Sequence, residues 1–133
     1  MELSYIAGFF DGEGMIRINR SMGKYYSLQC VVVNTDLKPL KYIQQIFGGT
    51  IAERKKYKSH HKTSYRWRVT SNDAKNFLEK IYPMLITKKE QALVGINFQN
   101  NMKKFGGRFS TTPESVIKNR EDDFEKLKLL KQI

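Results

Sequence analysis

The most informative segment of this 133-residue chain reads Ile6-Ala7-Gly8-Phe9-Phe10-Asp11-Gly12-Glu13-Gly14. Its apolar residues recur at the spacing of one helix face, which predicts a short helix. Ala7, Gly8 and Gly12 are small, so a second helix could approach the backbone closely. The two acids, Asp11 and Glu13, come where this helix ends and a strand begins. The segment therefore predicts carboxylates at the base of a helix–helix contact.

Two interpretations of this segment are open on its residues alone. In the simpler one it is a turn, in which Asp11 accepts hydrogen bonds from local backbone amides while Gly12 and Gly14 take positive φ. In the other, the second helix belongs to another copy, and a twofold axis brings two Glu13 carboxylates together. Such a pair is costly unless divalent cations lie between the acids, and this would make a metal-assisted phosphodiester cleavage site. Turn chemistry by itself favours the simpler interpretation.

Two hairpins separated by a helix are expected downstream. Residues 15–20 and 28–33 have the alternating side-chain pattern of strands around a turn at 21–24. Thr35 or Asp36 can cap a helix that Gly48-Gly49 ends. The second hairpin starts at Thr50, has its tip near 59–62 and returns through Tyr65, Trp67 and Val69.

Three more helices complete the predicted order. Ser71 or Asn72 opens one that Pro83 ends, and a capping box from Thr87 to Glu90 starts another that reaches Gly106-Gly107. Thr112-Pro113 begins a last, charged helix. The order αββαββα plus C-terminal helices predicts an α+β fold, in which one face of a four-stranded antiparallel sheet is covered by helices. We expect one domain over residues 1–133, with a core of about 1–105 and a helical extension of about 106–133.

Composition limits the class of protein further. Cys30 is the single cysteine, which excludes a disulfide within the chain. No uncharged apolar run approaches the roughly 20 residues of a membrane helix, and acids stand near the N-terminus instead of a basic leader. We therefore expect a soluble, intracellular protein that is not secreted and has no membrane partner.

The net charge of +11 is concentrated in one part of the chain. Residues 15–70 hold 12 Lys and Arg against Asp36 and Glu53. A cationic stripe of this kind neutralises phosphates, so it favours a nucleic-acid partner over a merely solvated basic surface.

The outward-facing side of the predicted sheet carries the residue types that recognise bases. Arginines suit guanine, and Asn19 and Gln29 suit adenine, if this face lies in the major groove of duplex DNA. The alternative is that strands place polar residues outward whatever they bind. The expected DNA-contacting residues are Arg17, Asn19, Ser21, Lys24, Gln29, Arg54, Lys56, Lys58, His61, Arg66, Arg68 and Thr70.

Residues 6–14 resemble the signature of the LAGLIDADG homing endonucleases, and the element order over roughly 1–105 is similar to the core of that family. The single copy of the motif implies a homodimer that binds a long, pseudo-palindromic DNA site and cuts both strands. The implied cofactor is Mg²⁺, whose sites Mn²⁺ or Ca²⁺ can also occupy. Alternatives are a non-cleaving RNA maturase or DNA-binding regulator on this fold, or a small basic RNA-binding protein.

The resemblance also implies roles for individual residues. Glu13 and the carbonyl of Gly14 would hold the metal, Lys88 would assist the nucleophilic water or stabilise charge on the phosphate, and Asn34 would order water. Lys88 and Lys89 begin a helix, where the helix dipole disfavours cations, so a bound phosphate would compensate them; an exposed lysine pair equally needs no compensation. The implied dimer interface comprises Ala7, Gly8, Asp11 and Gly12, with Asp11 a structural cap rather than a ligand.

Overall fold

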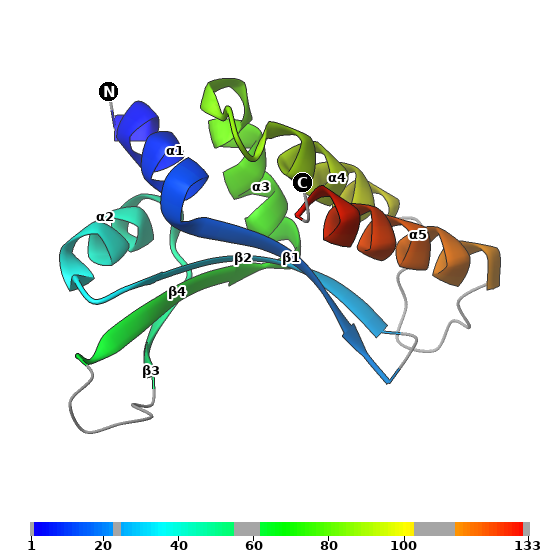
Figure 1. The fold of residues 1–133 in the computed structure, drawn as a ribbon, viewed down its shortest axis with the longest axis horizontal. Helices are drawn as coiled ribbons and strands as arrows, with labels where there is room; N and C mark the ends of the chain where they lie inside the picture. The colour runs from blue at the N-terminus through cyan, green and yellow to red at the C-terminus, as the bar shows by residue number, and fades with distance from the viewer. Residues whose placement is uncertain (1, 23–24, 55–61, 103–113, 132–133) are drawn as a thin grey trace.

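A computed structural model describes residues 2–22, 25–54, 62–102 and 114–131 of the chain (Figure 1). The element order confirms the predicted α+β fold and its αββαββα core. The elements are α1 (Glu2–Glu13), β1 (Gly14–Ser21), β2 (Tyr25–Asn34), α2 (Leu37–Phe47), β3 (Thr50–Arg54), β4 (Ser64–Thr70), α3 (Ser71–Ile81), the 3₁₀ helix η1 (Tyr82–Met84), α4 (Lys89–Met102) and α5 (Glu114–Leu130).

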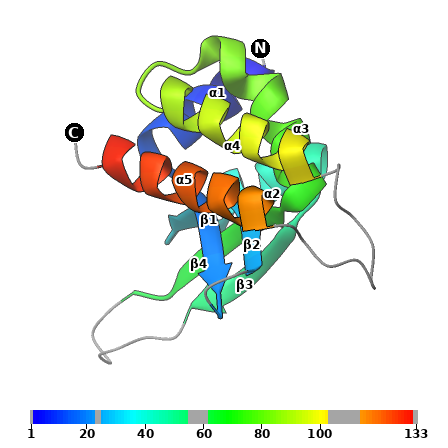
Figure 2. The same ribbon diagram turned by 90° about the vertical axis from the view of Figure 1, so that its right-hand side faces the viewer.

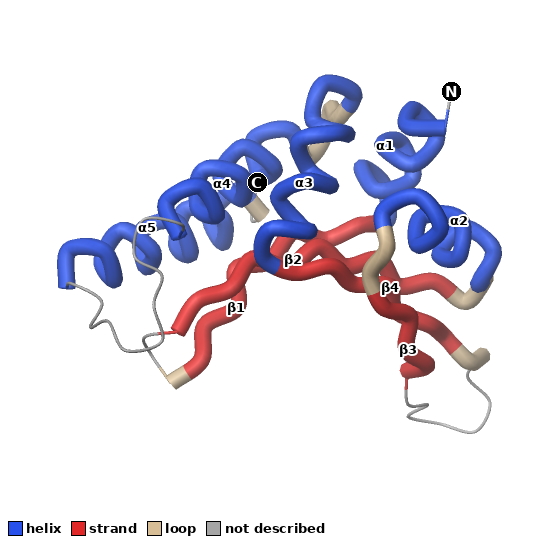
Figure 3. Tube along the Cα trace, turned by 180° about the vertical axis from the view of Figure 1, so that it is seen from behind, coloured by secondary structure: helices blue, strands red, loops and turns tan. Residues whose placement is uncertain are grey.

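The four strands form one antiparallel sheet in the order β1-β2-β4-β3. The sheet arches, and the helices lie on its convex side (Figures 1 and 3). Ile16 pairs with Cys30 and Cys30 with Val69, so one row of buried side chains crosses three strands beneath the helices. The period of two in the sequence is therefore confirmed, because each strand turns one apolar face toward the helices and leaves the concave face free of them.

An aromatic cluster joins α1 to the sheet. The Phe77 ring meets the rings of Phe10, Phe47 and Trp67 edge to face, at centroid distances of 5.1, 4.9 and 5.0 Å. The indole N–H of Trp67 donates to the carbonyl oxygen of Gly48 at 2.8 Å. Elements from four parts of the chain thus share one core, which holds α1 in a defined position above β1.

The junction between α1 and β1 corrects the turn interpretation of this segment. α1 runs unbroken to Glu13 and β1 begins at Gly14, and neither Gly12 nor Gly14 has a positive φ. Gly14 is required for space instead, because a Cβ there would lie 2.2 Å from the Phe10 ring. The absent side chain lets the strand begin directly beneath the helix that precedes it.

Of the three small residues of α1 that were expected on its exposed side, two are exposed and one is buried. Gly8 and Gly12 are exposed, and apart from the adjacent residues and the backbone of α1 itself, no atom of the described residues lies within 4 Å of where their Cβ atoms would be. Ala7, however, is fully buried within the single chain, which does not support its place in the predicted dimer interface. Its methyl group packs into the core because Ala7 follows Ile6 on the inward side of the helix.

The C-terminal helices lie side by side above β1 (Figure 2). The predicted last helix is confirmed as α5, whereas Gly106-Gly107 and Thr112-Pro113 lie outside the described residues. α2 begins and ends as expected, with Asp36 accepting from the amide of Lys38 and Gly48 at φ 75°. No helix in the described part of the chain is both long and apolar enough to cross a bilayer.

Candidate active site and nucleic-acid interface

Asp11 near the end of α1 caps the start of α4. Its carboxylate accepts hydrogen bonds from the backbone amides of Ile86 and Thr87 at 3.0 Å each and of Lys88 at 2.8 Å. The predicted capping box is corrected here, because this cap comes from another helix and not from Thr87. The expected role of Asp11 as a structural cap is confirmed, and its carboxylate is bound within its own chain.

The pKa of Asp11 reflects these contacts. Desolvation raises the pKa, but the hydrogen bonds from Thr87, Lys88 and Ile86 and the charge of Lys88 outweigh it. The pKa therefore lies below its usual value of 3.8, because each of these groups stabilises the carboxylate form. Asp11 is a permanently charged cap at neutral pH.

Lys88 returns the contact to α1. Its side-chain Nζ donates to the backbone carbonyl oxygen of Asp11 at 2.6 Å. The C-terminal carbonyls of a helix carry partial negative charge, so the ammonium lies where α1 stabilises a cation. The unfavourable position of Lys88 at the start of α4 is therefore compensated within the chain by the C-terminal end of α1. The contact also places the Lys88 ammonium at the end of α1, at the carbonyl of Asp11, which stands two positions before Glu13 in the sequence.

Glu13 is the last residue of α1, and its side chain is exposed. Among the described residues, its carboxylate takes part in no hydrogen bond or ion pair. Carboxylate and carbonyl oxygens are the donors that Mg²⁺ prefers, so Glu13 and the adjacent Gly14 carbonyl fit the implied ion chemically. Within the described ranges, no three His, Cys, Asp or Glu side chains of one chain converge on a common point.

Asn34 has a different environment from the one expected of a water-ordering residue. Its side-chain oxygen accepts from the backbone amide of Asp36 at 2.9 Å, which shapes the turn between β2 and α2. It lines a hollow with Tyr5 and Phe9 of α1 and Tyr42 of α2. The alternation of β2 thus turns Asn34 toward the helices, whereas its neighbour Val33 lies on the concave side with Arg66.

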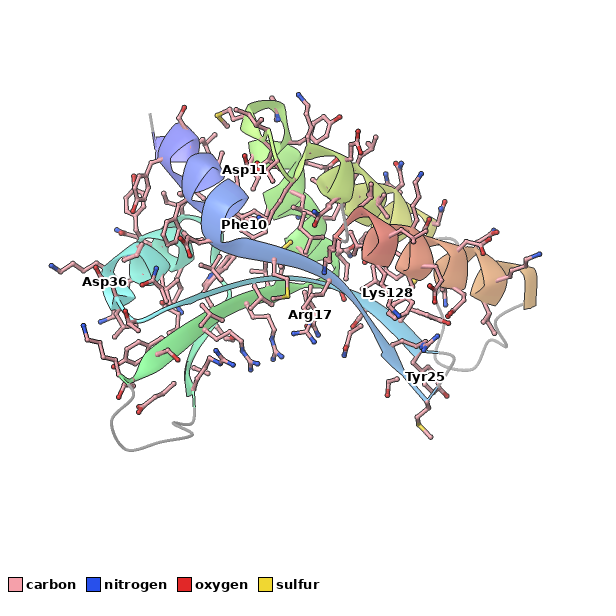
Figure 4. All side chains as sticks on the ribbon, viewed as in Figure 1. Phe10, Asp11, Arg17, Tyr25, Asp36 and Lys128 are labelled. Atoms are coloured by element: carbon pink, nitrogen blue, oxygen red, sulfur yellow. The ribbon has the colours of Figure 1, made fainter. Side chains whose placement is uncertain are left out.

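The concave face of the sheet carries the predicted base-reading side chains in rows. Arg17 pairs with Gln29 and Gln29 with Thr70, so these three form one row across β1, β2 and β4. Arg66 and Arg68 follow on the same face of β4 and are partly exposed. Figure 4 shows Arg17 on the side of the sheet opposite the helices. The register thus brings residues from distant parts of the chain onto one surface.

Of the remaining predicted DNA-contacting residues, three lie in the described part of the chain and four lie outside it. Asn19, Ser21 and Arg54 are exposed and share the concave face by strand alternation. The other four lie outside the described residues: Lys24, Lys56, Lys58 and His61.

Sequence reasoning missed the contribution of α5. Arg20, counted in the basic stripe, donates to Glu121 at 2.6 Å, and Tyr26 donates to the same carboxylate. At the end of α5, Lys128 and Lys131, the residue that follows the helix, line a hollow together with Arg17. The amide of Lys131 still donates to the carbonyl of Leu127 at 3.3 Å, so the two lysines, three apart, share one face, a signal the sequence offered. Their position over β1 depends on a contact between the two ends of the chain and had no local signal.

These features together define a class of protein. A lysine and two acids meet at the end of one helix, and a concave, arginine-bearing sheet lies below it. The sequence model of a family described as "LAGLIDADG endonuclease" matches residues 6–97, which is most of the chain. The chain belongs to the LAGLIDADG endonuclease family, and the predicted resemblance is confirmed. No curated protein matches the chain.

Solved structures share the fold at low sequence identity. The homing endonuclease I-CvuI, in complex with the I-CreI target in the presence of Mg, is 24% identical with a TM-score of 0.77; the match covers 97% of this chain and 81% of that chain. The archaeal intron-encoded I-Vdi141I complexed with DNA is 20% identical with a TM-score of 0.78, over 97% and 83%. I-TnaI is 17% identical with a TM-score of 0.66, over 99% and 97%.

Proposed function

We propose that this protein is a site-specific DNA endonuclease that acts as a homodimer and cuts both strands of a pseudo-palindromic duplex with a divalent metal. The observation that carries the proposal is the hydrogen bond from Lys88 Nζ to the Asp11 carbonyl, which holds a cation beside the unpaired acid Glu13. A cation and a free carboxylate at one helix end are the groups that phosphodiester hydrolysis needs.

The concave face supports duplex DNA as the substrate. Its arginines and amides lie in rows that follow strands, and a two-stranded ribbon fits the major groove. I-CvuI and I-Vdi141I, which share the fold, are each bound to DNA in their structures. We expect Arg66 and Arg68 to contribute to base recognition, and Gln29 and Thr70 to lie beside them on the same face.

The exposed side of α1 supports dimerisation. Gly8 and Gly12 leave open space where side chains would otherwise stand, so two such helices can approach backbone to backbone. A twofold axis there would bring a second Glu13 to the first. The chain matches 43% of I-SmaMI while 96% of its own length is covered, which is the size ratio expected if one chain of I-SmaMI contains two units of this kind.

The residues divide the chemistry between them. Glu13 and the Gly14 carbonyl would hold Mg²⁺, which when bound polarises the phosphate and activates water. Lys88 stabilises the negative charge that develops on the phosphate oxygens as water attacks. Asp11 keeps Lys88 in position through the amide of the same residue. We propose no direct role for Ala7, and the catalytic role of Asn34 stays a prediction that its contact with Asp36 does not support.

The decisive test is cleavage of a randomised duplex library with Mg²⁺, followed by Glu13→Gln on the selected site. Selection supplies the cleavable site on which the variant is then tested. We expect the variant to bind the site with unchanged affinity and to cut neither strand. Glu79→Gln, on α3, is the matched control. Cleavage by the Glu13 variant would overturn the metal assignment, and binding of the library by the wild-type protein without cleavage would favour the alternative of a non-cleaving DNA-binding regulator.

A further inference from the structure

We propose that the C-terminal end of α5 supplies two phosphate-binding lysines, Lys128 and Lys131, which with Arg17 hold the DNA backbone beside the cleavage centre. This inference rests on the proposed function, and it adds two residues that the DNA-binding set predicted from the sequence does not contain. It makes α5 part of the DNA-binding machinery and not only a cover for the sheet.

The geometry begins with a hollow of about 340 Å³ between α5 and β1. Four cationic side chains line it, Arg17, Arg20, Lys128 and Lys131, and no acidic side chain of the described residues does. β1 is an edge strand of the sheet, so side chains from both of its faces can line a hollow at this edge, and Figure 4 shows Lys128 and Arg17 near β1 there. A hollow surrounded by cations without an acid is a site for an anion.

Arg20 does not serve as the anion receptor of this hollow. Its guanidinium donates to Glu121 at 2.6 Å and lies 4.7 Å from the centre of the Phe124 ring. The hydrogen bond from Tyr26, with that from Arg20 adding to it, lowers the pKa of Glu121, so the acid stays charged and neutralises Arg20. Arg17, Lys128 and Lys131 remain, and none of the three has an acidic partner among the described residues.

The charges of the hollow interact with the charge of Lys88 at the proposed cleavage centre. The surrounding protein removes part of the hydration of Lys131, and the charges of Arg17 and Lys88 add to this, so the pKa of Lys131 is lowered. The positive charge of Lys131 is therefore repelled by both Arg17 on β1 and Lys88 at the end of α1. A phosphate between them would relieve the mutual repulsion, which the free protein leaves unrelieved.

α5 is held firmly enough to present these lysines. Leu127 is 2% exposed and packs in the core, and the Phe124 ring meets the Tyr26 ring at 6.3 Å. Tyr26 and Arg20 both donate to Glu121 one turn earlier. These contacts fix the rotation of α5, so that Lys128 and Lys131 face β1. Lysine acts on phosphate as a point charge, so we expect it to add affinity without base preference.

The test is the salt dependence of binding by a double variant, Lys128→Gln with Lys131→Gln. The matched control is Lys118→Gln with Lys126→Gln, which removes two charges from α5 away from the hollow. The slope of log Kd against log salt should fall by about 1 for each phosphate that is no longer bound, on the selected site and on an unrelated duplex alike. A homodimer would lose four such contacts, so the fall in affinity between about 50 and 200 mM salt should become about a hundredfold smaller.

Three outcomes separate this inference from the proposed function. Restoration of the slope by arginine at both positions supports a phosphate contact. A slope equal to that of the control variant overturns the inference, even when the wild-type protein binds and cuts DNA normally. Failure of the wild-type protein to bind any duplex overturns the proposed function instead. Equal unfolding midpoints of the two double variants show that the comparison concerns binding alone.

Discussion

Asp11 and Lys88 cap each other's helices. The Asp11 carboxylate accepts the backbone amide of Lys88 at 2.8 Å, and the Lys88 ammonium donates to the backbone carbonyl of Asp11 at 2.6 Å. One residue thus stabilises the N-terminal end of α4 and the other the C-terminal end of α1. The pair lies at the end of α1 that also carries Glu13, so the stability of the fold and the position of Lys88, the proposed catalytic cation, depend on the same contact.

Replacing Asp11 by Asn should therefore lower stability. An amide oxygen carries no charge and accepts fewer hydrogen bonds than the carboxylate, so three amides of the loop before α4 are less well satisfied. We expect a decrease of about 1–2 kcal/mol in the free energy of unfolding, measured by urea denaturation. Asp36→Asn is the control, since Asn serves as well as Asp at an ordinary helix N-cap. Equal decreases in both variants would contradict the reciprocal arrangement.

The same carboxylate should make stability depend on pH in acid. The pKa of folded Asp11 is below its usual 3.8, so the charged cap contributes its full stability above that value. As pH falls through 3.8 and then through the lower folded pKa, the folded state must take up a proton and the contribution is lost. The difference in unfolding free energy between wild type and Asp11→Asn should thus shrink below about pH 4. A constant difference down to lower pH would show that Asp11 is not the titrating group.

Lys88→Met should reduce cleavage and leave binding largely unchanged. The variant removes the cation that stabilises charge on the phosphate, and the removal of one such group costs about 100- to 1,000-fold in rate. Single-turnover cleavage of the selected site measures this. Lys89→Met is the matched control, because Lys89 is directed to the Tyr82 ring at 5.2 Å and not to α1. A similar decrease in rate in both variants would mean that the loss of positive charge, and not the position of Lys88, causes the effect.

Alanine at Gly14 should destabilise the chain through a clash. The added Cβ would lie 2.2 Å from the Phe10 ring, which is fully buried and meets Phe77. Either the ring or the start of β1 must move, at a cost of about 1–3 kcal/mol. Thermal and urea unfolding of Gly14→Ala measure this cost. An unchanged midpoint would mean that the helix and strand can separate without any decrease in stability.

Alanine at Gly8 should stabilise the single chain, in contrast to alanine at Gly14, and should weaken dimerisation. No atom of the described residues lies within 4 Å of its Cβ position, so the variant should gain up to about 1 kcal/mol of helix stability. The methyl group would nevertheless hold two α1 helices apart, and sedimentation should show weaker dimerisation. Asn76→Ala, at an exposed position of α3, controls for a change in helix propensity alone. Undiminished dimerisation would place the interface elsewhere.

Local patterns predicted the elements of this fold well, because each pattern acts over a few residues. The alternation at Ile16 and Ile18 and the cap at Asp36 are confirmed as expected. The helical spacing that Ala7 shares with Ile6 and Phe10 indicated its burial, but its small side chain favoured the helix contact, because local patterns do not show how deeply α1 sits over β1. The start of α4 was assigned to a local capping box for a similar reason, since Thr87 is adjacent in sequence while Asp11 is 76 positions away.

The amino-acid sequence by itself determined the α+β order, the basic face of the sheet and the motif that identifies the family. These depend on periodicity and on residue type, which are local properties. The tertiary structure alone decided that Asp11 and Lys88 cap each other and that Glu121 neutralises Arg20 from 101 positions away. Contacts across such separations depend on how helices rotate and settle on a sheet, and that is set by packing of the whole core.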